Sequence, residues 1–471
     1  MIDGLKGRRR MESIFNLGMV ADVLNGELVN CDAKTMVSSV STDTRTIENG
    51  ALFFALKGEN SDGHKFIPSA VERGAVCCVA ERGTNVTDEL PLILVENTSQ
   101  ALLDLAGEYR RKMRIPIVAV TGSVGKTSTR SMIGCVLAQK YNTLVTEGNF
   151  NNEIGVPHTL FRLNKEHEMA VIEMGMNHFG ELSRITAAVK PDTVVITNIG
   201  VSHIENLGSR EGILKAKLET LEGLSDGGTV ILNGDDDMLW GINGTLDFET
   251  LYGGVKNEKC DLVAENIKTY AENTEFTFTS DGTEYKAEIS VPGGHHVYNA
   301  LSSILVGMKY NVPVGAILDG IREFIPVGLR QAAIKIGKYT VIKDCYNANP
   351  TSMKSGLEIL KLSEAGDRKI ACLGDMMELG TISEREHLNT GKIIPSFNVD
   401  CLITVGERAR LIARGAAEAG MDARNIFSFA TIEEACRALP DILKENDVML
   451  LKASRSMHLE EIAYFMEDNM K

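Results

Sequence analysis

The sequence predicts an α/β protein of three domains built around mainly parallel sheets. Its 471 residues are too many for one hydrophobic core. Short continuous apolar segments, typical of strands covered on both faces, alternate with helical patterns in two separate stretches of the chain. This alternation indicates parallel sheets with crossover helices. The predicted domains are residues 1–112, 113–327 and 328–471.

Strand-like segments mark each of the three domains. The first domain also carries two helical patterns, and helical patterns follow most strands of the other two. The segment E-F-I-P-V-G-L-R at 323–330 is the expected linker before the third domain. The predicted strands are 51–56, 75–80 and 92–95 in the first domain, 115–120, 142–146, 169–174 and 193–199 in the second, and 339–344, 369–375, 401–406 and 448–454 in the third.

The composition excludes several classes of protein. A net charge of -15 disfavours nucleic-acid binding, because phosphates are neutralised by a basic surface. No apolar segment approaches the length needed to cross a bilayer, and the N-terminus lacks the pattern of a secretory signal. The nine cysteines show no metal-ligand spacing and are typical of structural thiols in a reducing compartment. We therefore expect a cytoplasmic monomer without membrane insertion, which starts at Met1 or Met11.

The segment V-A-V-T-G-S-V-G-K-T-S-T-R at 118–130 resembles a phosphate-binding loop. It lies between a predicted strand and a predicted helix, where free N–H groups and the positive helix end favour an anion. Val120 replaces the first glycine of the common pattern, but every group that contacts phosphate or metal remains. A simple glycine-rich turn is the alternative, which the Lys-Thr pair disfavours. The predicted nucleotide-binding residues are Thr121, Gly122, Ser123, Val124, Gly125, Lys126 and Thr127, with the Thr127 hydroxyl on Mg²⁺.

Two polar residues follow other strands of the central domain. In open parallel sheets, ligands bind beyond the carboxyl ends of the strands. Glu173 ends the segment 169–174 and is placed to join Thr127 on Mg²⁺, although alone it would be interpreted as a solvated carboxylate. His203 follows the segment 193–199, where a lone histidine is more often a capping or core residue.

Lys217 lies on the apolar face of a predicted helix. Apolar residues between Ile213 and Leu224 gather on one arc at helical spacing, and Lys217 falls inside that arc whereas Lys215 falls outside it. An inward lysine needs a partner, unless it extends to a nearby surface. Because these signals converge on one sheet edge, the sequence predicts a nucleotide–metal site. Its candidate catalytic residues are Lys126, Glu173, His203 and Lys217.

Eight longer motifs carry a resemblance to a known family. They are S-T-D-T-R-T-I-E-N-G-A-L-F-F-A-L-K-G, D-G-H-K-F, T-E-G-N-F-N-N-E-I-G-V-P, I-E-M-G-M-N, N-I-G-V-S-H-I-E-N-L-G-S-R-E-G-I-L-K-A-K, D-C-Y-N-A-N-P-T-S-M, L-G-D-M-M-E-L-G and K-A-S-R-S-M. Together with the short loop T-G-S-V-G-K-T-S, these motifs resemble the cytoplasmic ATP-dependent ligases that build peptidoglycan precursors. The resemblance covers nearly the whole chain.

The resemblance implies a uridine-nucleotide domain, a central P-loop ATPase domain and a C-terminal Rossmann-like domain. It implies that Thr127 and Glu173 hold one Mg²⁺ and that His203 lies near a second Mg²⁺. Relatives often carry a carbamylated lysine at the position of Lys217, which would turn a cation into an anion able to bind Mg²⁺. The other implied positions are Asn299, Arg330 and Asp344 for the adenine, phosphates and ribose of ATP, Thr44, Arg45, Gly58, Asp62 and His64 for the uridine diphosphate, and Asn149, Asn151 and Asn152 for the muramoyl peptide.

The implied reaction joins UDP-N-acetylmuramoyl-tripeptide to D-alanyl-D-alanine, after ATP has converted the peptide carboxylate to an acyl phosphate. Y-N-A-N-P-T-S-M and G-D-M-M-E-L-G favour this reaction over the sister ligase that adds the third amino acid, whose Asp-Asn-Pro-Arg-type motif the sequence lacks. The pattern at 41–66 disfavours a folyl-polyglutamate ligase. Intact Glu173, His203 and Lys217 disfavour a non-ligating nucleotide switch or a binding-only paralogue. The sequence leaves open the general base and whether the peptide contains lysine or diaminopimelate.

Overall fold

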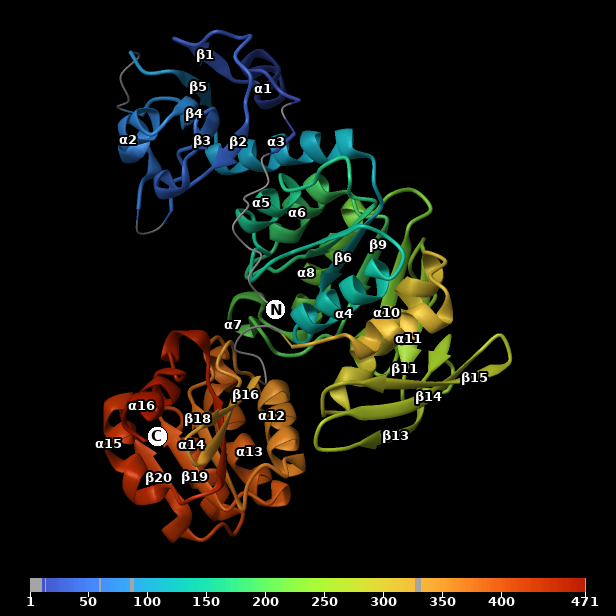
Figure 1. Ribbon diagram of the computed structural model, residues 1–471, viewed down its shortest axis with the longest axis vertical. Coiled ribbons are helices and arrows are strands. Elements are labelled where there is room, and N and C mark those ends of the chain that lie inside the picture. Colours follow the sequence, from blue (N-terminus) through green and yellow to red (C-terminus); the bar gives the residue numbers. More distant parts are fainter. Residues whose placement is uncertain (1–10, 13, 59–60, 85–88, 327–331, 471) are drawn as a thin grey trace. The chain divides into compact units, whose positions relative to one another are not determined.

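The computed structural model describes residues 11–12, 14–58, 61–84, 89–326 and 332–470 (Figure 1). The chain forms two compact units. The first comprises Met1–Val120, Tyr141–Val194 and Leu218–Gly228, and the second comprises Thr121–Lys140, Val195–Lys217 and Thr229–Lys471. The predicted α/β class with mainly parallel sheets is confirmed, whereas the predicted boundaries at 112/113 and 327/328 stay predictions.

The first five strands of the chain form one sheet. They are β1 Glu27–Val29, β2 Ser39–Ser41, β3 Ala51–Phe54, β4 Ala75–Glu81 and β5 Leu92–Val95, with the helices α1 Leu17–Leu24, α2 Ile67–Glu72 and α3 Thr98–Met113 and the 3₁₀ turns η1 Thr44–Thr46 and η2 Gly63–Phe66. The order is β1-β5-β4-β3-β2, antiparallel between β1 and β5 and parallel elsewhere. The three predicted strands are confirmed as β3, β4 and β5, while the three-residue β1 and β2 are too short to show a pattern.

A seven-stranded sheet carries the phosphate-binding loop. Its order is β12-β11-β10-β9-β6-β8-β7. The strands are β6 Ile117–Thr121, β7 Thr143–Val145, β8 Met169–Glu173, β9 Thr193–Ile196, β10 Thr229–Asn233, β11 Glu249–Gly254 and β12 Leu262–Val263. Every residue of β6, β8 and β9 is buried, which is why these strands show continuous apolar segments. The helices in this region are α4 Lys126–Ala138, α5 Gly155–Leu160, α6 Glu181–Val189, α7 Ile204–Leu207, α8 Arg210–Leu218, α9 Asp237–Trp240, α10 His295–Lys309 and α11 Val314–Arg322, with η3 Glu219–Gly223.

The predicted helix that carries Lys217 is shorter than its apolar arc. It ends as α8 at Leu218, and the 3₁₀ turn η3 carries the chain on to Leu224. The predicted side of Lys217 is nevertheless confirmed, because Lys217 is buried and Lys215 is exposed. A 3₁₀ turn keeps apolar residues inward at nearly the same spacing, so the pattern does not separate the two kinds of helix.

A separate antiparallel sheet was not predicted from the sequence. It contains β13 Glu265–Thr269, β14 Thr274–Ser280 and β15 Thr283–Ile289. Along β14, Thr274, Phe276 and Phe278 are buried while the residues between them are partly exposed. The signal in T-E-F-T-F-T-S is therefore an alternation of period two, which a search for continuous apolar segments does not detect.

The last six strands form a doubly wound sheet of order β16-β17-β21-β18-β19-β20. Apart from the antiparallel β16–β17 hairpin, its strands are parallel. They are β16 Ala332–Ile336, β17 Tyr339–Lys343, β18 Arg368–Gly374, β19 Cys401–Val405, β20 Ile426–Phe429 and β21 Asp447–Lys452. The helices are α12 Pro350–Leu362, α13 Ser383–Ile393, α14 Arg410–Glu418, α15 Ile432–Ile442 and α16 Glu461–Asn469, with the turns η4 Gly380–Ile382, η5 Ile394–Phe397, η6 Ala423–Asn425 and η7 Arg455–Met457. The four predicted strands are confirmed as β17, β18, β19 and β21.

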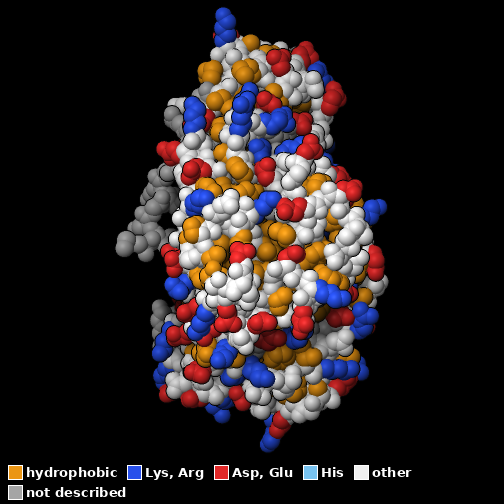
Figure 2. Space-filling view, turned by 90° about the vertical axis from the view of Figure 1, so that its right-hand side faces the viewer, with side chains coloured by type: hydrophobic (Ala, Val, Ile, Leu, Met, Phe, Trp, Pro, Cys, Tyr) orange, Lys and Arg blue, Asp and Glu red, His pale blue; other side chains and the backbone are white. Residues whose placement is uncertain are grey.

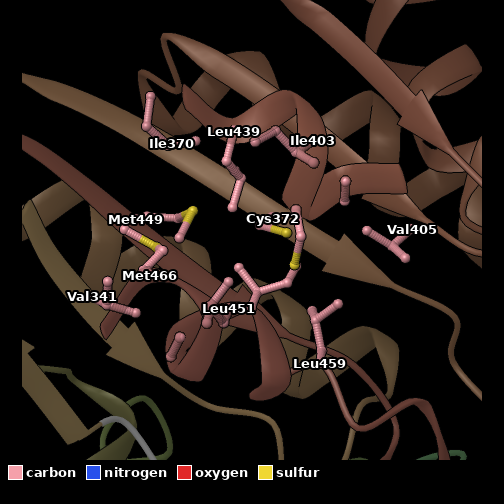
Figure 3. Close-up of a cluster of buried hydrophobic side chains, with 14 of the residues drawn as sticks. Val341, Ile370, Cys372, Ile403, Val405, Leu439, Met449, Leu451, Leu459 and Met466 are labelled. Carbon is pink, nitrogen blue, oxygen red and sulfur yellow. The ribbon is translucent and has the colours of Figure 1, made fainter. Parts of the chain in front are cut away.

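Each face of this last sheet buries its own hydrophobic cluster. On one face, Cys372 and Leu451 pack against Leu439 of α15 and Met466 of α16 (Figure 3). On the other face, Leu373 and Leu450 pack with residues of α12 and α14. Neighbouring residues of β18 and β21 thus point to opposite faces that are both buried, so these strands are apolar throughout.

On the face shown in Figure 2, acidic and basic side chains are interspersed and form no continuous basic field. Within the described residues, no helix is both long and apolar enough to cross a membrane.

Candidate functional site

The phosphate-binding loop joins the end of β6 to the start of α4. Gly122 has φ 144° and Gly125, the N-cap of α4, has φ 87°, so both adopt conformations that favour glycine. A Cβ atom at Gly122 would lie 1.9 Å from Thr197 Oγ1. The 13-residue helix α4 has no side-chain cap at its N-terminus. The loop therefore presents backbone N–H groups and a positive helix end without covering them, which is the arrangement that receives phosphate.

Residues after β9 brace this loop. The N–H groups of Ser123 and Val124 donate to the backbone and side-chain oxygens of Asn198, each at 3.0 Å. Asn198 Nδ2 and Thr197 Oγ1 both donate to the carbonyl of Val124, at 2.9 and 2.6 Å. Asn198 and Thr197 thus hold the curl of the loop. Sequence reasoning missed this role, because both residues fell inside the predicted strand 193–199, whereas β9 ends at Ile196.

Two amines occupy the site. Lys126 Nζ donates to the carbonyl of Gly122 at 2.8 Å, so its side chain folds across the loop. Lys217 is only 2% exposed. Burial, and secondarily the charge of Lys126, hold the pKa of Lys217 well below its usual value. Burial therefore favours the neutral form of the lysine that was predicted to face inward.

Glu173 is buried at the end of β8. Its Oε1 accepts a 2.8 Å hydrogen bond from Asn151 Nδ2, and its N–H donates to Thr146 Oγ1. Asn151 was expected along the path of the muramoyl peptide, and the structure also makes it a partner of Glu173. Of its neighbours, Asn152 accepts from Gly155 N–H at 2.8 Å. Asn149 is exposed.

His203 contacts a carboxylate from the loop that follows β18. Its Nδ1 is 2.7 Å from Glu378 Oε2. The hydrogen bond from His203 lowers the pKa of the Glu378 carboxyl, against the opposing effect of burial, and the charges of His203 and Lys126 add to the lowering. Glu378 was not predicted as a site residue. Its signal lay within L-G-D-M-M-E-L-G, where it stands with φ 63°.

Further contacts join the His203 segment to the loops after β17 and β18. Asn349 Nδ2 donates to Ser202 Oγ at 2.8 Å, and both residues are buried. Glu205 N–H donates to the carbonyl of Glu378 at 3.4 Å. His203 is thus fixed on both sides within the second unit.

The residues expected to contact ATP fall into three cases. Asn299 Oδ1 accepts from Thr129 Oγ1 of α4 at 2.9 Å, so Asn299 lies beside the loop. Asp344 Oδ2 forms a buried ion pair with Lys452 Nζ at 2.6 Å. Sequence reasoning missed Lys452, the first residue of K-A-S-R-S-M. Arg330 lies outside the described residues.

Comparison with known proteins identifies the family. Models of the Mur ligase middle domain, the Mur ligase glutamate ligase domain and the Mur ligase family catalytic domain match residues 120–307, 330–455 and 36–126. The UDP-N-acetylmuramoyl-tripeptide–D-alanyl-D-alanine ligase of Bacillus subtilis is 36% identical over 94% of this chain and 96% of its own. The chain belongs to the Mur ligase family.

Other Mur ligases match at similar coverage. The enzyme of the same name from Escherichia coli is 33% identical over 96% of this chain and 98% of its own. A crystal structure of MurF from Acinetobacter baumannii superposes with a TM-score of 0.88 at 30% identity, covering 96% of this chain and 99% of that one. MurF ligase from Thermotoga maritima, in complex with ADP, has a TM-score of 0.80 at 27% identity, covering 91% and 97%.

The residues that the Mur ligase resemblance assigned to the uridine diphosphate are mostly held by the N-terminal fold itself. His64 Nδ1 lies 2.7 Å from Asp62 Oδ1, and His64 Nε2 accepts from Glu81 N–H at 3.0 Å. Both ring nitrogens of the buried His64 are therefore used within the domain. Arg45 forms an ion pair with Asp43 at the surface. Thr44 begins η1, and the Gly58 N–H donates to the carbonyl of Ser61.

A Mg²⁺ ion, which is expected of a Mur ligase, needs oxygen ligands near the phosphate-binding loop. No cluster of three or more His, Cys, Asp or Glu side chains able to hold a metal occurs in the part of the chain that the structure describes. Mg²⁺ needs no such cage, because it commonly binds one or two carboxylates together with substrate phosphates and water. The Thr127 hydroxyl and the Glu173 carboxylate are oxygen donors of the required kind, so the residues present fit the ion.

Proposed function

We propose that this chain ligates D-alanyl-D-alanine to UDP-N-acetylmuramoyl-tripeptide, using ATP, to give the UDP-muramoyl-pentapeptide of peptidoglycan synthesis. The observation that carries the proposal is a phosphate-binding loop with two positive-φ glycines, Gly122 and Gly125, in a chain that matches ligases of this name over nearly its whole length. The reaction forms an amide from a carboxylate, which is a poor electrophile. Transfer of a phosphoryl group from ATP to the tripeptide carboxylate gives an acyl phosphate, which the dipeptide amine then attacks with release of phosphate.

The loop residues lower the barrier of the first step. Two anions, the tripeptide carboxylate and the γ-phosphate, must approach each other. Lys126 and the N–H groups at the start of α4 offset this repulsion and stabilise the charge that develops during transfer. Binding the reactants in line supplies much of the remaining acceleration. Asn299, Asp344 and Arg330 are the residues we assign to the adenine, ribose and phosphates of ATP.

Mg²⁺ would be held by Thr127 and Glu173, with His203 near a second ion, and would supply Lewis-acid stabilisation of the phosphoryl oxygens. For Lys217 we propose carbamylation. A neutral buried amine attacks the carbon of CO₂ and loses a proton to water, which leaves a carbamate anion. The lowered pKa of Lys217 supports this step, because only the neutral amine is nucleophilic. Labelling with ¹³C-bicarbonate tests it by NMR, since a Lys217→Arg variant should lack the carbamate signal.

The remaining assignments extend from the resemblance. We assign the N-terminal sheet, with Thr44, Arg45, Gly58, Asp62 and His64, to the uridine diphosphate end. For His64 the support is indirect, because its ring holds Asp62 and the Glu81 N–H in place. Asn149, Asn151 and Asn152 are assigned to the peptide path. We also propose that the enzyme acts as a monomer in the cytoplasm.

Phosphate release from ATP and Mg²⁺ tests the proposed function directly. UDP-muramoyl-tripeptide and D-alanyl-D-alanine are added separately and together, and the product is identified by mass. Release that requires both substrates, with a pentapeptide product, supports the proposal. Tripeptides that contain lysine and diaminopimelate, assayed side by side, show which wall type the enzyme serves.

Two results would overturn the proposal. Turnover with UDP-muramoyl-dipeptide and a diamino acid would identify the sister ligase instead. ATP binding without release in any combination would show that Lys126, Glu173, His203 and Lys217 do not form a catalytic site.

A further inference from the structure

Two cysteines of the N-terminal sheet lie with their sulphur atoms in contact. Cys31 follows β1 and Cys77 lies in β4, 46 residues away, yet their Sγ atoms are 3.2 Å apart. Cys31 Sγ also contacts the carbonyl of Leu92 in β5 at 3.5 Å. We propose that Cys31 and Cys77 are a dithiol that hydroperoxides oxidise to a disulfide. This modification site is independent of the proposed ligase reaction.

The two thiols differ in a way that gives each a role. Cys31 is partly exposed, whereas Cys77 is fully buried. The hydrogen bond from Cys77 lowers the pKa of the Cys31 thiol, and the same contact together with burial raises the pKa of Cys77. The thiolate is the reactive form of cysteine, and access decides which thiol meets the oxidant. Cys31 is therefore the attacking thiol and Cys77 the resolving one.

The chemistry balances with a hydroperoxide as the oxidant. The Cys31 thiolate attacks one peroxide oxygen, the O–O bond breaks, and Cys31 becomes a sulfenic acid while hydroxide or alkoxide leaves. Cys77 then attacks the sulfenic sulphur, the S–O bond breaks, and water leaves with the thiol proton. The two thiols lose two electrons in total, which the peroxide gains.

The oxidised bridge would link the segment after β1 to the interior of the sheet. Strand β1 is only three residues long and lies at the edge of this sheet. A cross-link over 46 residues restricts the unfolded chain and ties this edge strand to β4. Oxidation should therefore raise the unfolding temperature of the N-terminal part, and dithiothreitol should reverse the shift.

Peptide mapping of the full chain tests the proposal. The protein is treated with hydrogen peroxide, its remaining thiols are blocked, and it is digested with trypsin without reduction. Cleavage at lysine and arginine releases Cys31 in the peptide 11–34, and Cys77 together with Cys78 in the peptide 74–82. We expect a cross-linked 11–34/74–82 species that loses the mass of two hydrogen atoms and disappears on reduction.

Single variants distinguish the neighbouring cysteines. Cys31→Ala and Cys77→Ala should lose the cross-link and the thermal shift, whereas Cys78→Ala should keep both. Cys135→Ala is a matched control, because Cys135 is also partly buried but belongs to the helix α4. Absence of the cross-link in the oxidised wild-type protein overturns the proposal even if a variant fails to fold. A cross-link that survives in Cys77→Ala also overturns it, because Cys78 would then be the partner.

Discussion

The buried pair of Asp344 and Lys452 allows a quantitative test of the last sheet. The side chains are 10% and 2% exposed, and their charged atoms are 2.6 Å apart. Lys452→Met keeps most of the apolar stem, which packs near Gly356 of α12, but removes the ammonium. Asp344 then keeps a negative charge in a buried place without its counter-ion. Breaking such a pair by removing one partner costs about 3–5 kcal/mol.

The expected loss in the free energy of unfolding is large enough to measure by calorimetry. In a domain of about 150 residues, 1 kcal/mol corresponds to a shift of roughly 3–4 °C in Tm, so Lys452→Met should lower the transition of the last sheet by roughly 10 °C or more. Because Lys452 also donates to the carbonyl of Asn347 at 3.1 Å, the loop after Asp344 should loosen. If Asp344 binds the ribose, the KM for ATP should rise by about tenfold, the value of one charge-assisted hydrogen bond.

Two control variants separate the buried charge from other effects. Lys338→Met removes the partner of Glu445 at an exposed pair in turns next to the same sheet and should leave the transition unchanged. The double variant Asp344→Asn/Lys452→Met removes both charges and should recover much of the lost stability. A Lys452→Met protein that melts with the wild type would refute the reasoning, because it would mean that Asp344 is solvated without its partner.

Three further outcomes are expected at other positions. Gly122→Ala should lower ATP-dependent phosphate release by ~100-fold, since its Cβ overlaps a threonine hydroxyl, whereas Gly227→Ala, at a positive φ in open space, should keep activity. Burial lowers the pKa of His387 in the folded protein. As the pH falls below about 6.5, His387 is therefore protonated in the unfolded chain before it is protonated in the folded one. The free energy of unfolding should consequently drop between about pH 7 and pH 5. Urea unfolding should show a flatter pH dependence in His387→Gln, and equal slopes would contradict the assignment. Glu378→Gln removes the carboxylate that holds His203. It should raise the Mg²⁺ concentration for half-maximal activity by about tenfold. An unchanged Mg²⁺ titration would show that His203 does not contribute to Mg²⁺ binding.

Local patterns explain which parts of the structure could be predicted. The turn that carries Gly122 and Gly125, the inward side of Lys217 and most buried strands of the two large sheets follow from residues within one strand or helix. The buried strand β10 was not predicted. The antiparallel sheet of β13, β14 and β15 was missed because its alternating strands are covered on one face only. The Lys217 helix was predicted too long because a 3₁₀ turn continues its apolar arc.

Partners that are distant in sequence could not be predicted in the same way. Asn198 braces Val124 across 74 positions, and Lys452 pairs with Asp344 across 108 positions. Glu378 reaches His203 from another sheet. No periodicity connects such residues, because the fold alone brings them together. The family motifs contained all three residues, but a motif shows only that residues recur and does not identify what each one contacts.

The lysine charges around the phosphate-binding loop favour the binding of anions there. Lys126 and Lys217 are close enough that each charge disfavours the other, and Lys217 also has little access to water. The fold places Lys126 on the Gly122 carbonyl, a weak substitute for a phosphate oxygen. Two of the proposed events would relieve this arrangement: binding of the triphosphate beside Lys126 and conversion of Lys217 to a carbamate. The two negative groups alone would repel each other, but both are oxygen ligands of the kind that Mg²⁺ takes, so with Mg²⁺ present each should strengthen the binding of the other. We therefore expect bicarbonate to lower the Kd for ATP in the wild type but not in Lys217→Arg.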